Sequence, residues 1–160
     1  MDTLSLIPQR GCLMAKLFEN EHIKLPLTLF YSIFIPLSEI EVYGEKEDTE
    51  VMLEWIRFPV RSWRELANQE FRLPPYPEEG YVDGSVYLGH VHNPADVDRI
   101  KFGELRGNTI SIEIDIAFDF EQEGPAEFGV VDVQWKIEIE VDPDELDNLM
   151  IEAQRRGAII

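Results

Sequence analysis

The sequence predicts an α+β fold: a mainly antiparallel sheet built on a long C-terminal β-hairpin, with a short central helix and a C-terminal helix packed on the sheet. The first observation behind this prediction is the alternation of apolar and polar residues over 110–120 and again over 131–141. The second is a set of helix start and stop signals after residue 141. No internal repeat or linker interrupts the chain, so residues 1–160 are expected to form a single domain.

The hairpin prediction includes its register. A turn at residues 122–127 would set Glu121 opposite Phe128, and every apolar residue of one arm would then face an apolar residue of the other. The predicted pairs are Phe118 with Val131, Ile116 with Val133, Ile114 with Trp135, and Ile110 with Ile139. On the opposite face this register sets Glu113 against Lys136 and leaves most of the other carboxylates without a partner.

The N-terminal half of the chain is less regular. Residues 1–24 fit a short helix or an irregular segment, and residues 25–35 read as a buried strand that ends at Pro36. A second hairpin is expected to join residues 38–43 to residues 51–58 across a polar loop, although helix remains an alternative for the second of these segments.

Ser62 and Glu65 have capping-box spacing, which predicts a central helix of two or three turns that ends near Glu70. Three prolines in residues 73–77 then predict an extended surface connection. Beyond it, Asp83-Gly84 marks a bulge or a tight turn within residues 80–89, and residues 96–104 read as a further strand.

The C-terminal helix has the clearest signals in the chain. Asp142 can cap its N-terminus, Pro143 suits the first helical position, and Gly157 ends it. One apolar stripe is expected to face the sheet, formed by Leu146, Leu149, Met150 and Ala153.

Charge is the outlying property of the composition. The chain has 32 acidic residues against 14 basic ones, a formal net charge of -18. Such a surface disfavours nucleic acid and anionic membranes, because both are bound through Lys and Arg. It favours a basic protein as partner, since opposite charge speeds association. The sequence does not predict the oligomeric state.

Cys12 is the only cysteine, so the chain can form neither an intramolecular disulfide nor a thiolate metal cluster. The first residues do not resemble a secretory signal, and the most apolar run, residues 25–37, is short and contains two prolines. These features predict a cytoplasmic protein, and no sequence feature calls for a cofactor.

His90 and His92 are candidate metal ligands, because residues two apart in an extended chain project to the same side. Their spacing faintly resembles the His-x-His-x-Asp-His pattern of metallo-β-lactamase-type hydrolases, but Ala95 stands where that pattern requires a third histidine. Cys12 and His22 could act as nucleophile and base, yet no oxyanion-hole or phosphate-binding motif accompanies them. We therefore expect a protein that is not an enzyme.

The acidic face of the hairpin is the remaining candidate site. Residues 113–152 contain 14 carboxylates, and Lys136 is the only lysine or arginine among them. In size and acidity the chain is similar to bacterial immunity proteins, which neutralise a toxin, often a nuclease with a basic site. The resemblance implies an inhibitor of a basic toxin, and the alternative is a secretion-type chaperone or homodimeric adaptor. The residues expected to bind the basic partner are Glu113, Asp115, Asp119, Asp132, Glu138 and Glu140.

Overall fold

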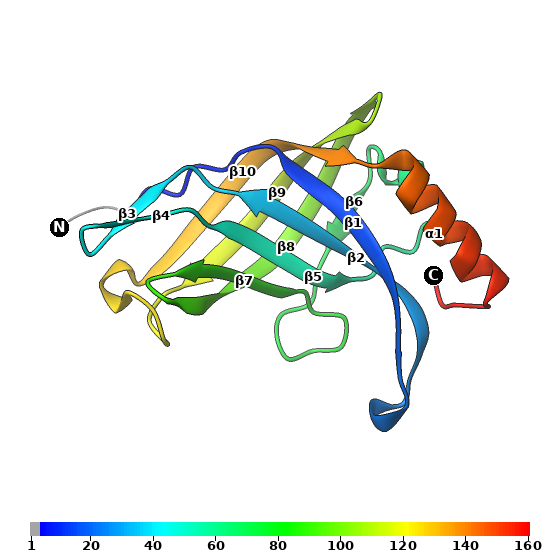
Figure 1. Ribbon diagram of the computed structural model, residues 1–160, viewed down its shortest axis with the longest axis horizontal. Coiled ribbons are helices and arrows are strands. Elements are labelled where there is room, and N and C mark those ends of the chain that lie inside the picture. Colours follow the sequence, from blue (N-terminus) through cyan, green and yellow to red (C-terminus); the bar gives the residue numbers. More distant parts are fainter. Residues whose placement is uncertain (1–3) are drawn as a thin grey trace.

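The computed structural model describes residues 4–160, and its main sheet closes on itself to form a seven-stranded barrel (Figure 1). Going round the barrel, the strands are β8, β7, β5, β2, β1, β10 and β9, and β9 pairs again with β8. Their bounds are β1 (Gly11–Asn20), β2 (Leu25–Pro36), β5 (Glu50–Ile56), β7 (Asp83–Leu88), β8 (Val91–Arg106), β9 (Thr109–Asp119) and β10 (Val130–Val141).

The remaining elements lie at the edge and the ends of this barrel (Figure 1). Strand β6 (Glu70–Arg72) pairs with the later part of β8, beyond the part that pairs with β7. Strands β3 (Ile40–Val42) and β4 (Glu45–Glu47) form a separate two-stranded sheet. The helical elements are the 3-10 turns η1 (Glu21–Ile23), η2 (Trp63–Leu66) and η3 (Ala126–Phe128), and the α-helix α1 (Pro143–Arg155).

The predicted α+β fold class is therefore wrong: the protein is a mostly β barrel with one C-terminal helix. Alternation within a strand shows that one face is buried, but an open sheet covered by helices and a closed barrel produce the same alternation. Strand β8 takes part in the barrel along both of its edges: it pairs with β7 and β6 along one edge and with β9 along the other.

Strand β1 replaces the helix or irregular segment predicted for the N-terminal residues. It pairs with β2 in antiparallel register, with Leu13 opposite Ile33. Apolar residues lie on both faces of β1, so its sequence lacks the alternation of apolar and polar residues that predicts a strand. Leu13 is buried inside the barrel, whereas on the outer face Phe18 packs edge-on against Trp55 at 4.9 Å between ring centroids.

The register predicted for β9 and β10 is confirmed. Phe118 lies opposite Val131, Ile116 opposite Val133, Ile114 opposite Trp135, and Ile110 opposite Ile139.

The second predicted hairpin, between residues 38–43 and 51–58, is wrong: β3 turns back into β4 at once, and β5 pairs with β2 and β7 instead. Asp83 and Gly84 form neither bulge nor turn, because both pair with β5 inside β7.

The predicted central helix is only the single turn η2. Ser62 accepts a hydrogen bond from the backbone of Arg64 instead of Glu65, and Glu65 accepts one from the backbone of Arg61 instead of Ser62. The reciprocal bonds of a capping box are therefore not made. Ala67 leaves the helical conformation with a ψ of 131°, and Asn68 follows with a positive φ of 62°.

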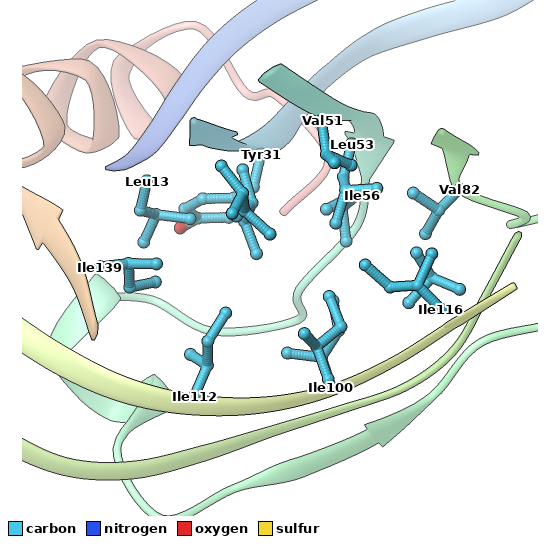
Figure 2. Packing of buried hydrophobic residues seen from close by; sticks show 14 of the residues in the cluster. Leu13, Tyr31, Val51, Leu53, Ile56, Val82, Ile100, Ile112, Ile116 and Ile139 are labelled. Carbon is cyan, nitrogen blue, oxygen red and sulfur yellow. The ribbon is translucent and has the colours of Figure 1, made fainter. Parts of the chain in front are cut away.

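Apolar side chains fill the interior of the barrel (Figure 2). Leu13, Leu53, Ile100, Ile112 and Ile139 reach this core from five different strands, and each is at most 2% exposed. Near η2 the core continues into an aromatic cluster, in which Phe58 contacts the rings of Tyr31, Phe71 and Phe102. Burial of this apolar surface is the main stabilising contribution to the fold.

The helix α1 begins and ends close to where the sequence predicts. Asp142 accepts a hydrogen bond from the backbone of Glu145, Pro143 is the first residue, and Leu146, Met150 and Ala153 are buried. The helix packs against β1 and β2, and Asp147 accepts hydrogen bonds from Trp63 and Arg64 of η2. Over residues 4–160, none of the helices has the length and apolar character needed to cross a membrane.

A short parallel pairing between β1 and β10 closes the barrel. It joins Gly11, Cys12 and Leu13 to Ile139, Glu140 and Val141. The earlier part of β10, residues 130–138, pairs with β9 only. We call this closing pairing and the unpaired stretch beside it the seam.

Candidate functional site

The six carboxylates predicted to bind a partner lie on the outer face of β9 and β10, opposite the apolar side chains that fill the barrel. The register extends each row of this face onto β8. One row contains Arg99, Asp115 and Gln134, and the next contains Lys101, Glu113 and Lys136. The face is therefore not uniformly acidic.

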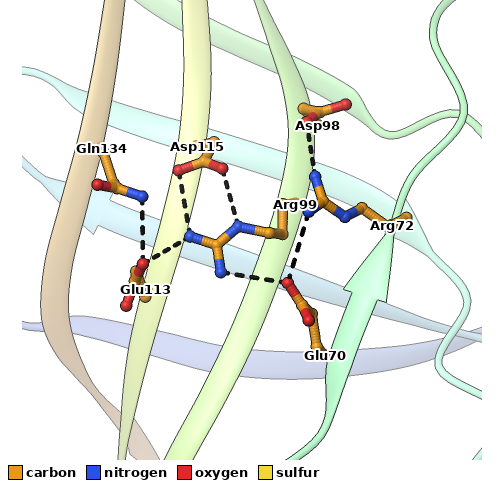
Figure 3. Close-up of polar contacts among 7 residues, drawn as sticks. All are labelled: Glu70, Arg72, Asp98, Arg99, Glu113, Asp115 and Gln134. Carbon is orange, nitrogen blue, oxygen red and sulfur yellow. Dashed lines mark hydrogen bonds and ion pairs between the residues drawn. The ribbon is translucent and has the colours of Figure 1, made fainter.

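Arg99 is at the centre of this face (Figure 3). Its side chain is 10% exposed, and its guanidinium nitrogens lie 2.6 Å from Glu113, 2.9 Å from Asp115 and 3.2 Å from Glu70 of β6. Gln134 adds a hydrogen bond to Glu113 at 3.1 Å. Hydrogen bonds from Arg99 lower the pKa of both Glu113 and Asp115, and the carboxylates raise the pKa of Arg99.

Apart from Glu113, most of these carboxylates were predicted to lack a partner, and this is wrong for three of the other five. Glu113 and Asp115 bind Arg99, while Arg10 lies 2.7 Å from Glu138 and 3.0 Å from Glu140. Lys136 does lie opposite Glu113 as predicted, but Arg99 makes the salt bridge. Asp119 accepts hydrogen bonds from Gln122 and from the backbone of Glu121, within its own loop.

One feature of the sequence could have located Arg99. The apolar residues Val97, Ile100 and Phe102 are three and then two positions apart, which breaks the alternation. The structure has a register shift between Val97 and Arg99 at this point, and the extra residue turns Arg99 to the outer face.

The Arg99 cluster predicts a specific pH dependence. In the folded state the pKa values of Glu113 and Asp115 lie below their ordinary values of about 4, so these groups stabilise the fold fully above that pH. The stabilisation is lost as the pH falls through the lower, folded pKa values. We expect Arg99→Gln to be less stable than wild type at pH 7 and the difference to shrink steadily in acid, as measured by urea unfolding across a pH series. A difference that stays constant with pH would contradict this account.

We call one hollow of the outer face the acidic groove, because two carboxylates in its lining, Asp96 and Asp132, have no salt-bridge partner among the described residues. It is a hollow of about 570 Å³ whose lining includes Leu73, Pro75, Asp96, Ala117 and Asp132. Asp96, Ala117 and Asp132 form one row across β8, β9 and β10, and the methyl side chain of Ala117 leaves the centre of this row open. Among the ion pairs of the described chain, none involves Asp96 or Asp132.

A second hollow of about 450 Å³ adjoins the acidic groove and shares Asp96 with it. Its lining includes Tyr76, Tyr81, Asp83 and Glu123, and the two tyrosine rings meet edge to face at 5.0 Å. Sequence reasoning considered Asp96 only as a possible metal ligand beside His90 and His92, and it did not place Asp96 or the proline-rich wall in the partner site, because the loop of residues 73–77 lies far from β9 and β10 along the chain. Only the fold brings them together.

The other candidate residues do not form a site. His90 occupies the turn between β7 and β8, with Nε2 3.4 Å from Glu45, whereas His92 packs against the ring of Tyr87. Within residues 4–160, no group of three or more His, Cys, Asp or Glu side chains is placed to hold a metal ion. Cys12 and His22 are at opposite ends of β1, and burial raises the pKa of the Cys12 thiol.

These observations define a small closed β-barrel with a partly neutralised acidic outer face and one uncompensated groove. No protein-family model matches the chain, and neither a curated protein nor a solved structure matches it.

Proposed function

We propose that this protein binds a basic protein partner through the acidic groove and blocks it, in the manner of a bacterial immunity protein that neutralises a toxin. The observation that carries the proposal is the row of Asp96, Ala117 and Asp132, in which two carboxylates without a salt bridge flank an open floor. A lysine or arginine side chain of the partner would reach both carboxylates from above Ala117.

The groove suits a basic side chain better than the rest of the face does. At the centre of the face Arg99 already binds Glu113 and Asp115, Lys101 and Lys136 flank Glu113, and a further cation there would meet repulsion. Beside Asp96 and Asp132, Leu73 and Pro75 provide apolar surface for the methylene stem of the incoming residue. The net charge of -18 would also steer a basic partner toward the protein.

An inhibitor is preferred here to a secretion-type chaperone, because the groove offers two carboxylates to a basic side chain, whereas a chaperone would hold an extended client along a free strand edge. Within the described chain, the stretches that pair on one side only include residues 130–138 of β10 and residues 14–20 of β1. A basic partner is preferred to nucleic acid, because the groove offers carboxylates where a phosphate backbone needs cations.

The test is capture of a partner from the lysate of the source organism at low salt, comparing Asp96→Lys with wild type. We expect Asp96→Lys to weaken the affinity of the captured protein by at least about tenfold, because the charge reversal acts inside the groove. Glu19→Lys makes the same change in net charge on β1, away from the groove, and is expected to change affinity by less than about threefold.

A captured partner that is toxic when expressed alone, and that wild type but not Asp96→Lys renders harmless, would support inhibition. Equal weakening by Asp96→Lys and Glu19→Lys would show that only net charge matters and would contradict a groove. A wild-type protein that retains no basic partner at low salt would contradict the proposal altogether.

A further inference from the structure

The seam leaves part of the β10 edge unpaired. On the side away from β9, β10 pairs with β1 only through residues 139–141. Across the seam the side chain of Arg10 binds Glu138 and Glu140, but the backbone of the N-terminal segment bonds elsewhere: Gln9 donates to Pro36, and Ser38 donates to Ile7. Among the described residues, no backbone hydrogen bond from outside the strands reaches residues 130–138.

Burial along the hairpin shows that this edge is partly open to solvent, although Trp135 at its middle is only 8% exposed. Ile112, Ile116 and Phe118 of β9 point into the barrel and are at most 2% exposed. Their partners on β10, Ile137, Val133 and Val131, also point inward but are only half-buried. Val130, where β10 begins, is 54% exposed. An open strand edge with apolar side chains beside it is a template for adding another strand.

We propose that β10 pairs in antiparallel orientation with β10 of a second copy of this chain, about a two-fold axis at Gln134. In this register Asp132 of each copy lies opposite Lys136 of the other, so that two ion pairs form across the interface. The remaining cross-strand pairs are Val131 with Ile137, Val133 with Trp135, and Gln134 with Gln134.

The charges along the edge select this register. A shift in one direction places Asp132 opposite Glu138, and a further step in that direction places Lys136 opposite its own copy. A shift in the other direction places Asp132 opposite Gln134 and forms no ion pair. Opposite charges stabilise a cross-strand pair and like charges destabilise it, so the register centred on Gln134 is the one that forms ion pairs while pairing all of residues 130–138.

Such a dimer has three consequences for the molecule. It would pair Asp132 of each groove with Lys136 of the other copy, so that in the dimer Asp96 would be the carboxylate left for a basic partner. The two-fold axis of an antiparallel strand pair is perpendicular to the sheet, so the acidic grooves of both copies would open on the same side. The two chains also repel each other, since each carries a net charge of -18. Salt would therefore strengthen the dimer, whereas it would weaken binding of a basic partner.

A charge-swap series tests the proposed pairing by sedimentation velocity. Asp132→Lys alone and Lys136→Asp alone place like charges opposite each other, and each is expected to raise the dimer dissociation constant by at least about tenfold. The double variant, Asp132→Lys with Lys136→Asp, restores both ion pairs and is expected to return to within about threefold of wild type. Glu19→Lys, on β1, controls for net charge.

Covalent trapping provides a second readout that does not depend on affinity. In a Cys12→Ser background, Gln134→Cys places two thiols opposite each other at the two-fold axis, and mild oxidation should produce a disulfide-linked dimer. Glu138→Cys is the matched control, because residue 138 would face Val130 of the other copy.

A wild-type protein that stays monomeric at about 100 μM in both low and high salt would overturn the proposal. The proposal would also be overturned if the double variant did not restore the dimer. It would be overturned as well if Glu138→Cys formed the disulfide-linked dimer as readily as Gln134→Cys. None of these outcomes depends on whether Asp96 binds a basic partner.

Discussion

Replacing Phe58 by alanine is expected to lower the free energy of unfolding by about 4 kcal/mol, among the largest effects of any single substitution in this barrel. Phe58 is 1% exposed and lies between β5 and η2, where the barrel wall ends. Its ring contacts those of Tyr31, Phe71 and Phe102 at centroid distances of 5.4, 4.9 and 5.3 Å. Alanine would leave a cavity that three rings on different strands could not collapse to fill.

The measurement for Phe58→Ala is urea unfolding followed by tryptophan fluorescence, with a thermal melt beside it. A loss of this size corresponds to a fall in Tm of roughly 12 °C for a chain of this length. Phe58→Leu keeps most of the volume and should cost less than about 2 kcal/mol. A loss below about 1 kcal/mol for Phe58→Ala would mean that the aromatic cluster is not tightly packed.

Gly84→Ala is expected to cost about 3 kcal/mol, although it adds only one methyl group. Gly84 lies inside β7 opposite Leu53, and a Cβ there would approach the carbonyl oxygen of Ala95 to under 3.0 Å, closer than real Cβ atoms come. The obstacle is the backbone of β8, which cannot move without disturbing its pairing with both β7 and β9. Conformation is not the cause, because Gly84 is in extended backbone.

A matched comparison separates crowding from backbone strain. Gly107 has a positive φ of 62° and nothing within 4 Å of its would-be Cβ, so Gly107→Asn should cost less than about 1 kcal/mol. Both variants are compared with wild type by urea unfolding. Equal losses at the two positions would show that the close approach between β7 and β8 does not constrain residue 84.

Local patterns in the sequence were enough to predict β9, β10 and α1. Apart from Ala117 and Val130, the apolar residues of β9 and β10 face the interior of the barrel, and Asp142 and Pro143 follow known helix-capping rules. Closure of the barrel could not be predicted in this way. It depends on β8 pairing along both edges and on β1 meeting β10, and neither contact leaves a signal in a short window of sequence.

The candidate site was also predictable only in part, because local patterns do not show which distant strands come together. Alternation placed six carboxylates on one face, but which of them stay free depends on cations from distant strands. Arg99 and Arg10 reach that face only in the folded barrel, and they bind four of the six. The groove needs Asp96 of β8 and the wall formed by Leu73 and Pro75, so its location follows from tertiary structure alone.

The seam also determines when the barrel can be completed during synthesis. Arg10 and Glu138, which lie together at the closing pairing, are 128 residues apart in the chain. A strand made early must therefore remain without one of its neighbours until almost all of the chain has left the ribosome. Contacts this distant in sequence are formed late and slowly. We expect a nascent chain with an exposed β1 edge, whose yield on refolding falls as its concentration rises.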